Sequence, residues 1–238
     1  MSQSPFQFKQ FTVEQDQCAM KIGTDGVLLG AWCPLRNRPY SILDIGAGTG
    51  LIALMLAQRS DAEMVDALEI DSLAYEQCVD NFESSPWADR LFCYHAGLDE
   101  FVEEMESEYD LIVSNPPFHS EIVSSGDLAR DNARQNQSLP FAELLDGVSK
   151  LLSDEGYFST IIPFKEEPAF LQLAASFNLF PNKIVRVKGN PTAEVKRSLL
   201  EFSFTNSDPV TSELIIEQER HVYTEQYTAL TKDFYLKM

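Results

Sequence analysis

Short apolar runs alternate with stretches at helical spacing from about residue 41 to residue 187. The runs have the length and β-branched content of buried strands, and they are Ser41 to Ile45, Met64 to Ile70, Leu91 to His95, Tyr109 to Ser114 and Tyr157 to Ile162. The clearest helix between them has Pro140 suited to its first turn, Gly156 beyond its end, and an apolar stripe at Phe141, Leu144, Leu145, Val148, Leu151 and Leu152. This alternation predicts an α/β fold with a doubly wound, Rossmann-like, mostly parallel sheet that binds ligands at the carboxyl ends of its strands.

The pattern changes toward both ends of the chain. Lys183 to Lys188 and Ser198 to Phe204 have the pattern of two strands around a Gly189-Asn190-Pro191 turn, which predicts an antiparallel pair at the C-terminal edge of the sheet. At the start, Phe6 to Phe11 alternate as an edge strand does. The tail predicts a helix whose apolar residues pack on one face, namely Tyr223, Tyr227, Leu230 and Phe234.

Length and composition favour one globular domain over residues 1–238. Within it we expect a cofactor-covering segment at 1–35, a cofactor-binding core at 36–187, and an edge strand and helix at 188–238. There is no run of 18 apolar residues, so we expect a cytoplasmic protein without a membrane span. The four cysteines stand singly and there are three histidines, a pattern that favours neither disulfides nor a metal site.

The net charge of −19 opposes nucleic-acid binding, because phosphate binding depends on Lys and Arg. The distribution of charge changes that picture between residues 183 and 197, where Glu194 is the single acid. The basic residues there are Lys183, Arg186, Lys188, Lys196 and Arg197. This segment is the predicted RNA contact, and the alternative is that its cations protect an exposed edge strand from aggregation.

A glycine-rich turn, Asp44-Ile45-Gly46-Ala47-Gly48-Thr49-Gly50, ends the first predicted strand. Glycines let the backbone approach a ligand closely and adopt conformations that a Cβ penalises. A dinucleotide fingerprint would need glycine at position 51, which is Leu51. The spacing instead resembles the Asp-x-Gly-x-Gly-x-Gly turn of class I methyltransferases. That resemblance implies that Asp44 and the turn hold the amino-acid half of S-adenosyl-L-methionine.

The next two strand ends supply further cofactor candidates. Glu69 follows Gly50 by 19 residues, where an acidic side chain can accept both ribose hydroxyls, and Asp71 is the second candidate for that role. After the third strand, methyltransferases of this class often place an Asp that binds the cofactor's adenine amine. This chain has Gly97 there, so either Asp99 or a backbone carbonyl is expected to take that role.

The fourth predicted strand ends in Asn115-Pro116-Pro117-Phe118. The amine of a nucleobase is a poor nucleophile because its lone pair is delocalised into the ring. The Asn115 side-chain carbonyl and the Pro116 backbone carbonyl can accept its two N–H bonds and turn the lone pair toward a methyl donor. Pro117 stiffens this geometry, and Phe118 offers a stacking face. The tetrapeptide resembles the amino-methyltransferase signature, which serves adenine N6, cytosine N4, guanine N2 and glutamine N5.

The chain as a whole resembles the bacterial tRNA(Val) adenine-37 N6-methyltransferase family. The resemblance rests on the segments Phe8 to Val13, Cys18 to Trp32, Ser85 to Arg90, Ile112 to Phe118, Ala129 to Asp131 and Leu230 to Leu236. It implies methylation of the purine beside the anticodon, a base in a hairpin loop that can be splayed into a pocket. It also implies a segment that closes over the cofactor, carrying Lys21, Gly23, Thr24 and Asp25.

Two alternatives stay open from the sequence. A ribosomal RNA guanine-N2 methyltransferase would use the same Asn-Pro-Pro-Phe end. A catalytically silent cofactor-binding protein or RNA chaperone is disfavoured because it would not need Asn115. The identity of the nucleoside that acquires the methyl group separates all three.

Overall fold

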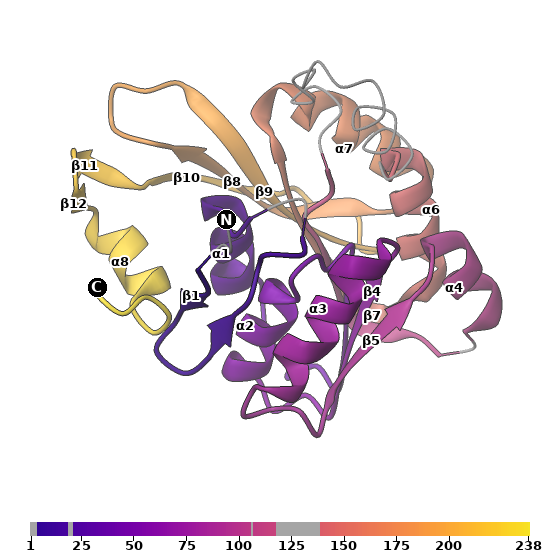
Figure 1. Cartoon of the computed structure of the whole chain (residues 1–238). Helices are drawn as coiled ribbons and strands as arrows, with labels where there is room; N and C mark the ends of the chain where they lie inside the picture. The colour runs from indigo at the N-terminus through magenta and orange to yellow at the C-terminus, as the bar shows by residue number, and fades with distance from the viewer. Residues whose placement is uncertain (1–3, 19–20, 106, 118–138) are drawn as a thin grey trace, which may run out of the picture.

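A computed structural model describes residues 4–18, 21–105, 107–117 and 139–238. Figure 1 shows a twisted central sheet with helices on both faces. Its eight strands run in the order β10-β8-β9-β7-β6-β3-β4-β5. The strands span Ser41–Ile45 (β3), Met64–Glu69 (β4), Leu91–His95 (β5), Tyr109–Ser114 (β6), Leu152–Pro163 (β7), Phe180–Lys188 (β8), Val195–Ser203 (β9) and Val210–Ile215 (β10).

The two faces of the sheet bury separate apolar clusters. One face is covered by α1 (Thr24–Trp32), α2 (Leu51–Arg59), α3 (Ser72–Glu83) and α8 (Glu225–Thr231). The other is covered by α4 (Leu98–Glu104), α6 (Phe141–Leu151) and α7 (Glu167–Ser176), which follows the short 3-10 helix η2 (Phe164–Glu166). Burial of both faces explains why the central parallel strands β3, β4 and β6 are largely apolar. The doubly wound, mostly parallel fold expected from the sequence is therefore confirmed.

The central strands β3 and β6 and the edge strand β5 match their predicted ranges to the residue. β4 ends one residue early, at Glu69, and Ile70 is exposed. β7 is longer than predicted because α6 passes into it without a loop, so Gly156 lies inside the strand. Pro140 is the N-cap residue of α6, one position before its first turn.

The predicted antiparallel pair exists, but its edge position was wrong. β9 pairs antiparallel with both β7 and β8, and β10 covers the far side of β8 in parallel register. The edge strand on that side is therefore β10, which the sequence did not predict. Its burial is low along most of its length, so it lacks the apolar alternation of a half-buried strand.

Both chain ends also differ from expectation. The predicted strand at 6–11 is a small antiparallel ladder outside the main sheet, formed by β1 (Phe6–Gln7) and β2 (Thr12–Val13). The tail helix α8 is shorter than the predicted stripe, because Tyr223 belongs to β12 (Val222–Tyr223), which pairs with β11 (Glu217–Glu219), and Phe234 follows the helix end. The two ends of the chain meet, since Phe8 forms an antiparallel bridge with Tyr235. Within the described part of the chain, no helix is long and apolar enough to cross a membrane.

Candidate active site

The register of the sheet brings the predicted site residues to one edge. Ile45, the last residue of β3, is level with Leu68 of β4 and with Ser114 of β6, and Glu69 is level with His95 of β5. The Ser114 hydroxyl donates to the Ile45 carbonyl at 2.8 Å and ties these two strand ends together. The glycine turn, Glu69 and Asn115 therefore emerge side by side at the carboxyl ends of three adjacent strands.

The glycine turn uses the left-handed conformation at each of its glycines. The φ angles of Gly46, Gly48 and Gly50 are 73°, 56° and 77°, values that a Cβ would strain. A Cβ placed on Gly46 or Gly48 would meet no atom within 4 Å, whereas one on Gly50 would lie 2.5 Å from the Phe82 ring. Gly50 is thus required by packing against α3. Gly46 and Gly48 border open space, as a turn that cradles a ligand would.

Glu69 holds the turn in place from the next strand. Its two carboxylate oxygens accept hydrogen bonds from the backbone N–H groups of Gly48, at 2.7 Å, and Asp71, at 2.8 Å. Asp71 in turn caps α3 by accepting from the N–H groups of Leu73 and Ala74. Both acids therefore lie at the carboxyl ends of the strands and have defined local partners. Their contact with the ribose stays a prediction.

Asp44 lies beneath the turn and is completely buried. One carboxylate oxygen accepts from the Ala53 N–H at 3.1 Å, and the other has no hydrogen-bond partner among the described residues. Burial raises the pKa of Asp44 to about 7, the hydrogen bond from Ala53 opposes this shift, and the nearby Glu69 adds to it. A cation that comes close to this carboxylate would favour its ionised form.

Asn115 has a second unsatisfied oxygen at this edge. Its side-chain oxygen is buried and accepts no hydrogen bond from the part of the chain that the structure describes. Pro116 is buried behind it, and Pro117 is half-buried. A buried acceptor without a donor costs free energy unless a ligand supplies one. The strand end therefore has the acceptor that an amine substrate requires. Phe118 lies outside the described residues.

The N-terminal segment reaches the same edge. Charges on Glu69 and Asp71 help to raise the pKa of the Cys18 thiol to about 12, after the larger effect of its burial, so Cys18 lies near both acids. Lys21, Gly23 and Thr24 are exposed, and Gly23 is the N-cap residue of α1. Asp25, in the first turn of α1, forms an ion pair of 2.7 Å with Arg197. This ion pair therefore joins the predicted cofactor-covering segment at 1–35 to the basic segment at 183–197.

The end of β5 carries Gly97 as the N-cap residue of α4. A Cβ on Gly97 would lie 2.7 Å from a carboxylate oxygen of Asp99, so the Asp99 side chain occupies the position beside Gly97. Ile70 and Leu73 are exposed apolar residues, and Ile70 also lies near Gly97. The sequence analysis did not single them out. The signal for Ile70 in the sequence was an apolar residue directly after the acid Glu69 at a strand end.

The basic segment is largely neutralised in the folded protein. Arg186 pairs with Glu167 at 2.7 Å, Lys188 with Glu213 at 3.1 Å, and Arg197 with Asp25. Lys183 lies over the Trp32 ring, 5.4 Å from its centre. Lys196 is exposed and has no ion pair within the described ranges. The five residues thus do not form one free cationic surface.

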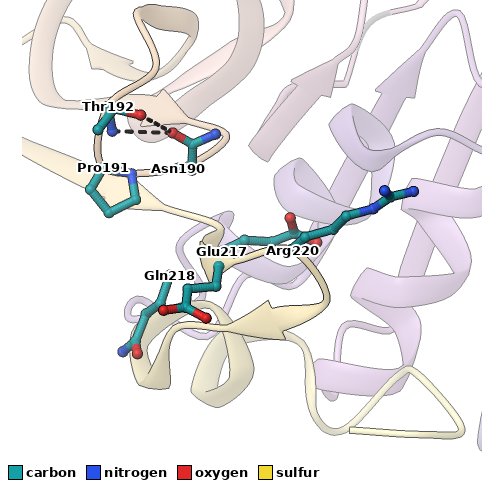
Figure 2. Close-up of a pocket in the computed structure, with 7 residues that line it drawn as sticks. Asn190, Pro191, Thr192, Glu217, Gln218 and Arg220 are labelled. Carbon is teal, nitrogen blue, oxygen red and sulfur yellow. Dashed lines mark hydrogen bonds between the residues drawn. The ribbon is translucent and has the colours of Figure 1, made fainter.

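A hollow of about 460 Å³ lies next to this segment, between the turn after β8 and the β11–β12 hairpin (Figure 2). The Asn190 side-chain oxygen accepts from the N–H and the hydroxyl of Thr192, which leaves it engaged within the turn. The charged residues that line the hollow are two acids, Glu217 and Glu219, and one cation, Arg220. This excess of acid disfavours a phosphate ligand there.

Comparison with known proteins identifies the chain as a methyltransferase. Residues 28–138 match the family model of the methyltransferase small domain. A solved structure described as a predicted O-methyltransferase from Agrobacterium tumefaciens has a TM-score of 0.69 at 18% identity, and the match covers 88% of this chain and 96% of that one.

Closer relatives identify the particular family. A protein from Christiangramia forsetii is 62% identical over 100% of both chains, and one from Flavobacterium psychrophilum is 63% identical over 98% of this chain and 100% of its own. Both are named tRNA1(Val) (adenine(37)-N6)-methyltransferase. The chain belongs to this family.

Proposed function

We propose that this protein transfers a methyl group from S-adenosyl-L-methionine to the N6 amine of adenine 37, in the anticodon loop of tRNA1(Val). The names of the full-length relatives support this reading, and none of them favours the guanine-N2 alternative. The observation that carries the chemistry is the buried, unpartnered side-chain oxygen of Asn115 beside the glycine turn.

The cofactor fits the open side of the turn. Gly46 and Gly48 would border its amino-acid half, Asp44 would lie near its ammonium, and Glu69 would accept from its ribose. When bound, the cofactor supplies a methyl group on a positively charged sulfur. Asn115 and the Pro116 carbonyl hold the two N–H bonds of the adenine amine, so the nitrogen lone pair points at that methyl group. As the adenine nitrogen bonds the methyl carbon, the bond between that carbon and the sulfur would break, which leaves S-adenosyl-L-homocysteine, and the amine would release one proton to solvent.

Identification of the modified nucleoside tests the proposal. The protein is incubated with tRNA, with ribosomal RNA and with methyl-labelled cofactor, and the hydrolysed RNA is analysed by mass spectrometry. We expect N6-methyladenosine from tRNA alone. N2-methylguanosine from ribosomal RNA would support the alternative enzyme, and the absence of any label would support a catalytically silent protein.

Asp44→Asn is expected to stabilise the free protein at pH 8 while it weakens cofactor binding. Because burial raises the pKa of Asp44 to about 7, the folded wild type loses stability as the pH rises from about 4 through 7, and a neutral Asn does not. We expect a rise in Tm of at least about 2–4 °C at pH 8, measured by scanning calorimetry.

Cofactor binding, unlike folding, should favour the ionised form of Asp44. A cation near Asp44 favours its ionised form, so wild-type affinity rises between pH 6 and about 7.7, where an α-ammonium begins to lose its own proton. Calorimetric titration of Asp44→Asn should give weaker binding without that rise. Equal affinity in the two proteins at pH 7.5 would place the ammonium elsewhere.

Lys196→Gln is expected to weaken tRNA binding, because Lys196 is the exposed member of the basic segment and stands beside the catalytic edge. Its neighbour Arg197 is in register with Pro163, at the carboxyl end of β7. Loss of one phosphate contact should reduce the slope of log affinity against log salt by up to roughly one unit and leave cofactor affinity unchanged.

The matched control is Lys150→Gln. Lys150 is also exposed, but it lies in the last turn of α6, just before β7 begins. It is therefore near the amino end of β7, whereas Lys196 is near the carboxyl end of that strand. Fluorescence anisotropy at several salt concentrations should show wild-type binding for this control. If Lys196→Gln behaves in the same way, the tRNA contact belongs elsewhere, and Lys9, Lys21, Arg130 and Arg134 are the next residues to test, of which the last two lie outside the described residues.

A further inference from the structure

Asn81 of α3 joins three segments that are distant in the sequence. Its side chain is 2% exposed, and its oxygen accepts from the Glu14 N–H at 2.8 Å. Its amide nitrogen donates to the Glu14 carbonyl at 3.0 Å and to the Thr49 carbonyl at 2.9 Å. Thr49 lies between Gly48 and Gly50. One buried side chain thus binds both the N-terminal segment and the glycine turn.

This contact is a second side-chain attachment of the turn, in addition to Glu69. Glu69 accepts from the Gly48 N–H, and Asn81 donates to the carbonyl of the next residue, Thr49. Backbone hydrogen bonds fix part of the turn, because the N–H groups of Gly46 and Ala47 donate to the Leu68 carbonyl and the Gly50 N–H donates to the Ala47 carbonyl. Glu69 and Asn81 bind two further polar groups between them, the Gly48 N–H and the Thr49 carbonyl, and so help to orient the backbone beside the open space at Gly46 and Gly48.

Gln77, one helical turn before Asn81, attaches further residues of the N-terminal segment to α3. Its side-chain oxygen accepts from the Gln17 N–H at 3.1 Å, and its nitrogen donates to Asp16 at 2.6 Å. Gln77 is 5% exposed, so it is also committed to these contacts. Residues 14 to 17 are therefore held along α3 immediately before Cys18, which lies near Glu69 and Asp71.

We propose that Asn81 is a positioning residue that couples the N-terminal cover to the glycine turn, so that both sides of the cofactor site are set together. The proposal rests on the proposed function, because it takes the turn as the cofactor site. An amide is required at position 81, since it has one acceptor for Glu14 and two donors for two carbonyls. Neither Asp nor Leu can supply those donors.

Asn81→Asp is the sharpest test, because it keeps the shape and the acceptor but removes both donors. We expect calorimetry to show at least about tenfold weaker binding of S-adenosyl-L-methionine, a loss of about 1.4 kcal/mol. Amide hydrogen exchange should become faster at residues 14–17 and 46–50. With saturating cofactor, kcat should stay within about twofold of wild type, because Asn81 does not face the substrate amine.

Val148→Ala is the control for a purely structural effect. Val148 is buried on α6, in the apolar cluster on the other face of the sheet. This variant should lower the Tm without changing cofactor affinity or exchange in residues 46–50. A cofactor affinity that falls equally in both variants, or stays at the wild-type value in a folded Asn81→Asp, would overturn the proposal.

Gln77→Ala keeps the proposal testable if Asn81→Asp does not fold. It releases residues 16 and 17 and leaves the Thr49 contact intact, so exchange should rise at 14–17 and cofactor affinity should fall about threefold. Unchanged affinity would show that the cover and the turn are not coupled. If the wild type itself does not bind S-adenosyl-L-methionine, the proposed function is wrong. If a folded variant binds the cofactor as tightly as the wild type does, only the coupling proposal is wrong.

Discussion

Asn115→Ala is expected to lose methyl transfer by about two orders of magnitude or more while it binds the cofactor as the wild type does. The substitution removes a buried acceptor that has no donor among the described residues, so it costs the free protein little stability. Single-turnover methylation of tRNA measures the chemical step, and calorimetry measures cofactor binding. Near-normal turnover would reassign the strand end to a structural role.

The chain contains a matched control in a second Asn-Pro sequence, Asn190-Pro191. The oxygen of Asn190 accepts from Thr192 and Ala193, and the residue is exposed in the turn after β8. Asn190→Ala should loosen that turn and leave single-turnover methylation unchanged. The contrast separates the chemistry of an unpartnered Asn oxygen from the structural role of an Asn before proline.

Gly48→Val is expected to reduce affinity for S-adenosyl-L-methionine by about 100-fold. The new side chain would project into the open space beside the turn, and its backbone would be strained at a φ of 56°. Gly48→Ala, with a smaller side chain, should show an intermediate loss of affinity. Unchanged cofactor affinity in the valine variant would remove the turn from the site.

Gly50→Ala distinguishes packing from ligand binding within the same turn. Its φ is also positive, but its Cβ would lie 2.5 Å from the Phe82 ring and 2.8 Å from the Cys78 sulfur. We expect this variant to lose several degrees of Tm, whereas Gly48→Ala should lose mainly affinity. A larger fall in Tm for Gly48→Ala than for Gly50→Ala would contradict this division of roles.

The sequence predicted β3, β4 and β6 well because these strands are buried on both faces and are therefore largely apolar. It also predicted β5, an edge strand with several exposed residues, from its apolar and aromatic residues. It missed β10, where only the end of the strand is buried, and so it placed the β8–β9 pair at the edge of the sheet. It also overextended the tail helix, since an apolar stripe marks packed positions whether or not the backbone between them is helical. The contact between Phe8 and Tyr235 joins the chain ends and has no local signal.

The candidate site was predictable where one short segment carries the chemistry, as in the glycine turn and the Asn-Pro-Pro-Phe end. Contacts between distant segments were not. The ion pair of Arg197 with Asp25 depends on tertiary structure and alters the charge that the basic segment presents. Gln77 and Asn81 did leave a signal, because they share the helical stripe of Ala74, Cys78 and Phe82 that α3 buries. Two amides at buried positions indicate specific hydrogen-bond partners.

Mapping of the methylated position tests the central claim most directly. A transcript of tRNA1(Val) is incubated with the wild-type protein and the cofactor, digested to oligonucleotides and sequenced by mass spectrometry. We expect one added methyl group, on the N6 amine of adenine 37. We expect none on a transcript with guanine at that position, and none when Asn115→Ala is the enzyme. Methylation that persists on the guanine transcript would contradict the central claim.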